Sequence, residues 1–355
     1  MEANNNISLV RYISLRYADP VCAIDLSDKY LLYGTMLGTS AIYSINQRKL
    51  ITLSETQEEH VSGVKIDDNN NENKLYVCIG DYRIFKYESF NENSNEVPKS
   101  NPIDNYPSDA EHEQNCDKCF TMLKNDYLVR TFIDFPADTK TGSVVEDTKY
   151  SYKNIIDLSE KTGKIKMSNY SVPFDFDGKY YIFVDFLEQK KRKFTIYDAL
   201  SESVFMDFEI EKKKIGHISL LKILKNNLIF WVRDYNICEI RDLDLDKFDQ
   251  PIKTFNVRGS EILAFDVIYT DENDPESLKI IFVDIYCNVY LYSFKLDKQE
   301  LLFNMENLSI DQVIKDQRFF SMGYPYYIKV SKQYMAISSD YGIVLLQHVP
   351  FEKII

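Results

Sequence analysis

The sequence has few histidines, which catalytic sites often use, and no long apolar run of the kind that spans a membrane. Its 355 residues include 4 histidines and 1 Trp, and 42 Lys and Arg face 55 Asp and Glu, which leaves a net charge of −13. No run of about 18 apolar residues occurs, so no membrane insertion is expected. The start, MEANNNISLV, lacks the basic and apolar stretches of a signal peptide. A chain this acidic is also a poor partner for phosphate backbones, so we expect no nucleic-acid binding.

Glycine and proline are scarce too, at 11 and 10 residues, whereas 26 Tyr and 22 Phe favour strands. The six cysteines are scattered, and four of them lie in apolar, strand-like runs such as VCAI and YVCI. A disulfide framework is therefore not expected. Buried, reduced thiols fit a cytoplasmic protein better.

Motifs for catalysis are lacking. No Gly-x-Ser-x-Gly elbow occurs, and four histidines make a nucleophile–base pair hard to build. The stretch GTMLGTS at 34–40 resembles a phosphate-binding loop only superficially, because it lacks the Lys and no helix follows. We therefore predict a protein that is not an enzyme and holds no cofactor.

What the sequence does have is a recurring unit. FDFDGKY at 174–180 precedes the β-rich run YIFVDF, and three similar stretches also combine an apolar residue, a charge, a short turn and a β run. They are IDLSDKY at 24–30, LKILKNN at 221–227 and IKVSKQY at 328–334. The strands fall into seven groups of about four, spaced by roughly 50 residues, slightly more than the ~40–45 of common propeller repeats.

These groups predict an all-β fold, a seven-bladed β-propeller of four-stranded antiparallel sheets that spans 1–355 as a single domain. The second group has no clear fourth strand, and the seventh ends after three. A spare strand, ISLVRYISLR, lies at 7–16. Because an unclosed seam would leave a raw strand edge, we expect this N-terminal strand to pair with the last blade, beside 342–349.

The motifs resemble those of WD-repeat proteins. Gly216-His217 followed by Arg241-Asp242 resembles the Gly-His…Trp-Asp frame, and IYD at 196–198 and SSDYGIVLL at 338–346 resemble its strand-end and hairpin parts. The resemblance implies a buried structural hydrogen-bond network. Its residues here are His217, Asp234, Ser338 and Asp340. Arg241 stands where the family has Trp, and the single Trp231 lies on a second strand.

Charged residues recur near the end of the first strand of each group except the third, and their signs alternate. They are Asp25, Lys65, Asp175, Lys222, Asp266 and Lys329. Three interpretations remain open: ordinary turn residues, an ion-pair ring at one mouth of the central channel, and a ligand site in that channel. Neighbours of opposite sign should pair, and an exposed pair contributes about 0–1 kcal/mol.

Three further clusters can be interpreted either as ordinary structural or solvated residues or as functional sites. His112, Cys116 and Cys119 could fill three zinc positions, but no fourth ligand is evident, so we predict no metal site. DLDLDKFD at 242–249 could bind calcium but lacks the Gly and Glu of a calcium loop. The basic run at 190–193 could be an import signal or contact an acidic partner, but charges in a turn are usually solvated.

Two segments interrupt the strand pattern. Residues 89–115 are polar and acidic and contain three prolines, which predicts a mobile insert or one ordered by a partner. Residues 135–149 form a similar insert. Propellers commonly bind through loops on a rigid scaffold.

Together these features predict a non-enzymatic protein–protein interaction scaffold. We expect a cytoplasmic subunit of a larger assembly, with the cytoskeleton as one setting, that binds other proteins through its faces and the 89–115 loop. The alternative is a propeller hydrolase or metal-dependent enzyme at the channel mouth, with Asp25, Asp175 and Asp266 as its nucleus. Recognition of a short linear peptide at that mouth is a third possibility.

Overall fold

The structure is a computed structural model that describes most of the chain. The described residues are 7–15, 19–55, 59–68, 74–80, 83–87, 100–105, 118–124, 126–133, 145–154, 159–168, 171–188, 191–211, 218–244, 246–248, 250–257, 260–271, 273–305, 327–339 and 342–348. In this part of the chain, no helix has the length and apolarity that a membrane crossing would require.

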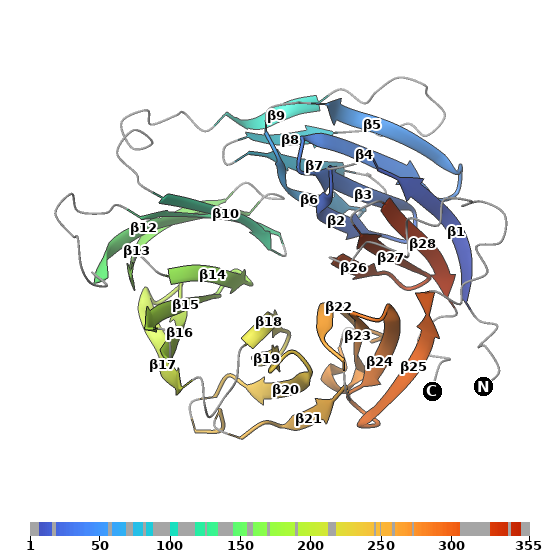
Figure 1. Cartoon of the computed structure of the whole chain (residues 1–355). Coiled ribbons are helices and arrows are strands. Elements are labelled where there is room, and N and C mark those ends of the chain that lie inside the picture. Colours follow the sequence, from blue (N-terminus) through green and yellow to red (C-terminus); the bar gives the residue numbers. More distant parts are fainter. Residues whose placement is uncertain are drawn as a thin grey trace. The chain divides into compact units, whose positions relative to one another are not determined.

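The described strands form seven four-stranded antiparallel sheets, which confirms the predicted seven-bladed β-propeller (Figure 1). Blade 1 has β2 (Val21–Leu26), β3 (Tyr30–Thr35), β4 (Thr39–Ser44) and β5 (Lys49–Glu55). Blade 2 has β6 (Val61–Asp67), β7 (Lys74–Ile79), β8 (Arg83–Tyr87) and β9 (Ser100–Asn105). Blade 3 has β10 (Lys118–Lys124), β11 (Tyr127–Ile133), β12 (Val145–Asn154) and β13 (Glu160–Ser168).

The remaining blades repeat this order. Blade 4 has β14 (Ser171–Phe176), β15 (Tyr180–Glu188), β16 (Lys191–Asp198) and β17 (Ser203–Glu211). Blade 5 has β18 (Ile218–Leu224), β19 (Leu228–Arg233), β20 (Ile237–Asp242) and β21 (Lys253–Asn256). Blade 6 has β22 (Ile262–Tyr269), the short 3₁₀ helix η2 (Pro275–Ser277), β23 (Leu278–Asp284), β24 (Asn288–Ser293) and β25 (Lys298–Asn304).

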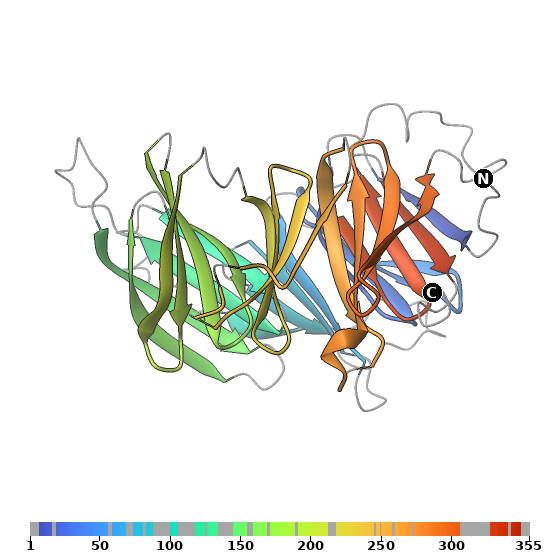
Figure 2. The same ribbon diagram turned by 90° about the horizontal axis from the view of Figure 1, so that it is seen from below.

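Blade 7 is completed by the N-terminal strand, as predicted. Its sheet order is β1 (Ile7–Ser14), β28 (Gly342–His348), β27 (Tyr334–Ser339) and β26 (Tyr327–Val330). β1 runs antiparallel to β28, with Ile7 opposite His348 and Ser14 opposite Gly342. Both views place the blue strand β1 against the red strand β28 (Figures 1 and 2).

The chain divides into two compact units. Unit 1 comprises residues 1–80, 85–101 and 255–355, and unit 2 comprises 81–84 and 102–254. In unit 1 the first strands follow one another as β22, β26, β2 and β6, and in unit 2 as β10, β14 and β18. The apolar core lies between consecutive blades. One cluster joins Leu32 and Ile42 of blade 1 to Val64 and Val77 of blade 2, and another joins Ile182 of blade 4 and Trp231 of blade 5.

The structure corrects two of the predicted inserts in part. β9, the fourth strand of blade 2, lies inside the segment 89–115 that we expected to be a loop, and β12 begins at Val145, inside the predicted insert 135–149. Both strands pair with their sheets although their sequences, SNPIDN and VEDTKYSYKN, are mostly polar. β9 is the outermost strand of its sheet and needs few apolar residues, whereas β12 is paired on both sides and buries Tyr150 and Tyr152, which are 2% and 5% exposed. The rest of 89–115 lies outside the described residues.

Candidate interaction site

The three predicted aspartates occupy equivalent places in the first strands of three blades. Asp25 of β2 accepts a hydrogen bond from the backbone N–H of Ile66 in β6, with Oδ2 2.8 Å from the nitrogen. Asp175 of β14 does the same with Ile223 of β18 at 2.7 Å. Asp266 of β22 does it with Val330 of β26 at 3.1 Å. Each carboxylate therefore ties its blade to the next one within its own unit.

The predicted lysines lie one residue before these N–H donors. Lys65, Lys222 and Lys329 directly precede Ile66, Ile223 and Val330. The Nζ of Lys329 lies 3.8 Å from Oδ1 of Asp266, so this pair of opposite sign is a loose ion pair. A continuous charge ring around a channel stays a prediction. What the structure adds is a backbone partner for each carboxylate, which sequence reasoning missed.

The four residues of the predicted hydrogen-bond network are not brought together among the described residues. His217 and Asp340 lie outside them. Asp234 is exposed at the β19–β20 turn and forms an ion pair with Arg233 at 3.5 Å. Ser338 is fully buried in β27, and its Oγ has no hydrogen-bond partner in the described part of the chain.

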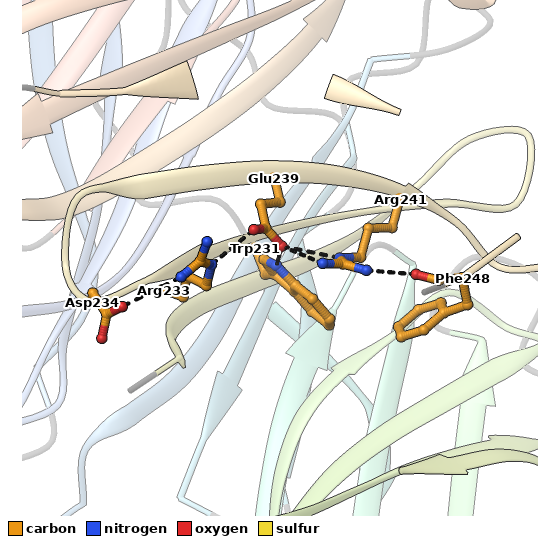
Figure 3. A network of polar contacts seen from close by, with 6 residues as sticks. All are labelled: Trp231, Arg233, Asp234, Glu239, Arg241 and Phe248. Atoms are coloured by element: carbon orange, nitrogen blue, oxygen red, sulfur yellow. Dashed lines mark hydrogen bonds and ion pairs between the residues drawn. The ribbon is translucent and has the colours of Figure 1, made fainter. Parts of the chain in front are cut away.

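A different buried polar network holds blade 5 together (Figure 3). Glu239 of β20 accepts a hydrogen bond from Nε1 of Trp231 at 2.8 Å and two from Arg241 at 2.7 and 3.0 Å. Its other oxygen accepts from Nε of Arg233 at 2.7 Å. Arg241 also stacks over the Trp231 ring, 4.8 Å from its centroid, and donates to the carbonyl of Phe248 at 2.5 Å.

The Glu239 network has the electrostatics of a fully paired buried carboxylate. Burial alone would raise the pKa of Glu239. The hydrogen bonds from Arg233, Arg241 and Trp231 outweigh burial and hold the pKa below its usual value. Arg241, which the motif resemblance aligned with a Trp, instead donates hydrogen bonds to Glu239. The alternating charges in CEIRD, an otherwise apolar strand, are the sequence signal that could have revealed this network.

The structure says little about the candidate metal sites and the basic cluster. His112 and Cys116 lie outside the described residues, and of Cys119 only the backbone in β10 is described, so zinc binding stays untested. No group of three metal-ligating side chains occurs among the residues that the structure covers. Asp242 and Asp244 both lie near Nζ of Lys247, at 3.8 and 3.0 Å. Lys193 of the basic run pairs with Asp207 at 2.5 Å.

One end of unit 1 gathers exposed apolar side chains. We define the entry face as the described residues where first strands begin and where second strands turn into third strands. It consists of 19–22, 35–39, 59–62, 79–80, 83, 260–263, 284–288, 327–328, 338–339 and 342. The starts of neighbouring first strands lie at the same end, because Sγ of Cys22 at the start of β2 donates to the carbonyl of Val61 at the start of β6.

Four large apolar side chains are exposed on the entry face. They are Tyr286 at 58%, Met36 at 51%, Leu37 at 50% and Tyr327 at 39%. Sequence reasoning missed them, since the Met36–Leu37 turn was considered only as a phosphate loop. Exposed apolar residues that gather on one face commonly mark an interaction surface.

Buried carboxylates hold these turns in place. Oδ1 of Asp19 accepts a hydrogen bond from the backbone N–H of Leu37 at 2.8 Å. Oδ1 of Asp284 accepts from the N–H groups of Tyr286 and Asn288, at 2.9 and 2.8 Å. Backbone bonds add to this, from Met36 N to Pro20 O and from Ile285 N to Glu261 O. The apolar anchors therefore stand on fixed turns.

The same carboxylates act on nearby ionisable groups. Burial, with a smaller contribution from Asp19, raises the pKa of Tyr33 to about 12. Burial, followed by Asp284, raises the pKa of Tyr290 to about 12. The negative charges of Asp19 and Asp284 therefore contribute to the raised pKa values of these two tyrosines beneath the exposed turns.

No protein-family model and no curated protein sequence matches the chain. Among solved structures it is similar to the crystal structure of Chaetomium thermophilum Raptor, with a TM-score of 0.61 and 8% identity over 97% of this chain and 29% of that chain. It is also similar to the computationally designed Ika8 protein, with a TM-score of 0.52 and 9% identity over 96% of this chain and 100% of that one. At such identities the likeness shows the fold alone.

Proposed function

We propose that this chain is a non-enzymatic protein–protein interaction scaffold, built on a degenerate WD-repeat propeller and acting as a cytoplasmic subunit of a larger assembly. The observation that carries the proposal is the entry face. It presents Tyr286, Met36 and Leu37 on turns fixed by buried carboxylates, and Tyr327 at the start of β26. Anchors that are already rigid lose little conformational entropy on binding, which favours a docking role.

The enzyme alternative has less support. Asp25, Asp175 and Asp266 would be its nucleus, yet each commits one carboxylate oxygen to the N–H of the next blade. Such an oxygen is already satisfied and serves as a structural acceptor. Stoichiometric zinc or calcium in the purified protein would instead favour the metal-dependent alternative.

The proposal is tested by affinity capture with matched variants. The face variant carries Leu37→Ala and Tyr286→Ala. The rim variant carries Leu296→Ala and Leu301→Ala, whose side chains are similarly exposed, at 50% and 47%, at the third-to-fourth-strand turn and on the outermost strand of blade 6. Truncating an anchor usually costs more binding energy than truncating a residue at the periphery.

We expect proteins captured by the wild-type chain to be retained by the rim variant and lost by the face variant. A chain that captures nothing specific, or that loses its partners equally in both variants, would contradict the docking role of this face. A third variant of the chain, from which residues 89–115 are deleted, tests the separate prediction that this segment contributes to partner binding.

A further inference from the structure

The entry face is predominantly acidic. Its acidic residues are Asp19, Glu59, Glu261 and Asp284, and among the described residues that define it Arg83, at the start of β8, is the one Lys or Arg. Asp19 and Asp284 are buried beneath the apolar turns, whereas Glu59 and Glu261 are only half-buried. Glu59 lies over the second-to-third-strand turn of blade 2, since a Cβ on Gly80 would come within 2.7 Å of its Oε2.

The opposite end of unit 1 differs in charge. The turns there mix both signs, and cations lie in each kind of turn. They are Lys29, Arg48, Lys49, Lys74, Lys295, Lys298 and Lys332 among the described residues. The chain's excess of acidic residues is therefore not spread evenly, and the entry face is a region of negative potential with apolar anchors. Such a potential raises the local concentration of cationic partners and speeds their association.

Aromatic rings add to the preference for cations. Tyr286, whose backbone N–H is bonded to Asp284, and Tyr327, at the start of β26, present exposed rings on this face, and the face of an aromatic ring attracts Lys and Arg side chains. A second copy of the chain would bring another net charge of −13 against this face, which disfavours self-association. The chemistry that fits is a segment with positive charges and aliphatic side chains.

We propose that the entry face binds a Lys- or Arg-bearing segment of a partner protein whose aliphatic side chains rest on Tyr286, Met36 and Leu37. This inference rests on the proposed scaffold function and specifies the partner's chemistry. Glu59 and Glu261 attract the cations, and the buried carboxylates of Asp19 and Asp284 keep the turns in place while adding to the field. Apolar and ionic contacts both contribute to affinity, so binding should weaken with salt without vanishing.

The test uses the full chain and a labelled peptide of about twelve residues in which Lys and Leu alternate, a length typical of linear docking segments. Fluorescence anisotropy at about 50 and about 500 mM NaCl measures affinity at weak and strong screening. A peptide with Glu in place of every Lys is the chemical control. The face and rim variants described above separate the apolar contacts.

A second pair of variants separates the charges. Glu59→Gln with Glu261→Gln removes two carboxylates from the entry face, and Glu276→Gln with Glu300→Gln removes two from elsewhere in unit 1. We expect about tenfold weaker binding for the face variant, as for loss of an anchor. The Glu59/Glu261 variant should bind more weakly and lose most of the salt dependence, while the rim and Glu276/Glu300 variants should stay within about twofold of wild type.

Three results of the peptide-binding experiment would overturn the inference. One is equal binding of the Lys and Glu peptides, and another is equal loss in face and rim variants. The third is absence of peptide binding up to about millimolar concentration, the weak limit for such segments. Concentration-dependent dimerisation in sedimentation velocity, abolished in the face variant, would assign the face to a second copy and also reject the basic segment. Partner capture that needs the face but not its carboxylates would leave the scaffold function standing and reject only this inference.

Discussion

At the scale of single residues, the buried carboxylate of Glu239 has the most demanding hydrogen-bonding environment described above. It accepts from two arginines and one Trp in the middle of blade 5 (Figure 3). Removing one partner of a buried ion pair leaves the other charge uncompensated, which costs far more than losing an exposed pair. Glu239 therefore fixes the orientation of both arginines and of Trp231.

Glu239→Gln should lower the free energy of unfolding by about 3 to 5 kcal/mol, because Arg241 is left as a buried, unbalanced cation. Urea denaturation followed by tryptophan fluorescence measures this change, and Trp231, the chain's single Trp, is the reporter. The matched control is Asp234→Asn, which removes the exposed partner of Arg233 and should cost less than about 1 kcal/mol. Similar losses in both variants would contradict a central role for Glu239.

The lowered pKa of Glu239 predicts a pH dependence with a definite sign. The unfolded chain has an ordinary Glu pKa near ~4.3, so the stability that Glu239 contributes is complete above that value. It is lost as the pH falls through the lower pKa of the folded state. The stability gap between wild type and Glu239→Gln should therefore be constant at neutral pH and narrow in acid, as urea denaturation at several pH values would show. A gap that widens in acid would reverse the assignment.

At the scale of elements, the first strands are tied together by aspartates. Apolar residues pack between consecutive blades, but such contacts are non-directional and do not fix how far one strand slides along the next. A carboxylate that accepts from a single N–H does fix this, in the β2–β6, β14–β18 and β22–β26 pairs. These three bonds set the register between blades.

Asp175→Ala tests this role, since Asp175 is only 2% exposed. The N–H of Ile223 would lose its acceptor, and we expect a loss of about 1 to 3 kcal/mol in thermal or urea unfolding. Asp175→Asn keeps an acceptor oxygen and should recover most of that loss. Asp207→Ala, which breaks the exposed pair with Lys193, should cost under about 1 kcal/mol. If Asn were as damaging as Ala, the charge rather than the hydrogen bond would be the stabilising feature.

The elements also show how far sequence reasoning reaches. Blade number, strand order and the place of β1 follow from a pattern repeated seven times, so local errors cancel. β9 was missed because SNPIDN has a Pro and few apolar residues, yet an edge strand needs only a partner on one side. The three aspartates were found from their spacing. Their true acceptor role was hidden, because a backbone N–H of the next blade leaves no mark in the sequence.

The entry face was less predictable for a related reason. Met36 and Leu37 look like core residues, and only the β3–β4 turn geometry turns them outward. The buried carboxylates beneath them lie one strand away in the sequence or further, as Asp19 does from Leu37. Periodicity in the sequence predicts which apolar residues face the core of a strand, but the turn geometry decides which apolar residues are exposed to solvent.

At the scale of the whole molecule, the decisive contact joins the two ends of the chain. β1 and β28 are separated by more than three hundred residues, yet they pair from Ile7–His348 to Ser14–Gly342, with one register shift between Leu9 and Arg11. β28 would otherwise be a raw edge, because its other neighbour, β27, occupies only one side. The approach is close, since a Cβ on Gly342 would come within 2.5 Å of the carbonyl oxygen of Ile13.

Deletion of residues 1–15 should therefore leave a chain that keeps most blades but exposes the β28 edge and aggregates. A synthetic peptide of residues 1–15 should bind this edge in trans by strand addition, raise the Tm and restore hydrogen-exchange protection in 342–348. A peptide of the same composition in scrambled order is the control.

Gly342→Ala in the full chain tests the same contact without truncation, because crowding against Ile13 should lower the free energy of unfolding by about 1 to 3 kcal/mol. Gln347→Ala, an exposed change on the same strand, should cost little. Rescue by the scrambled peptide, or an unperturbed Gly342→Ala protein, would show that β1 does not close blade 7 in the way the register describes.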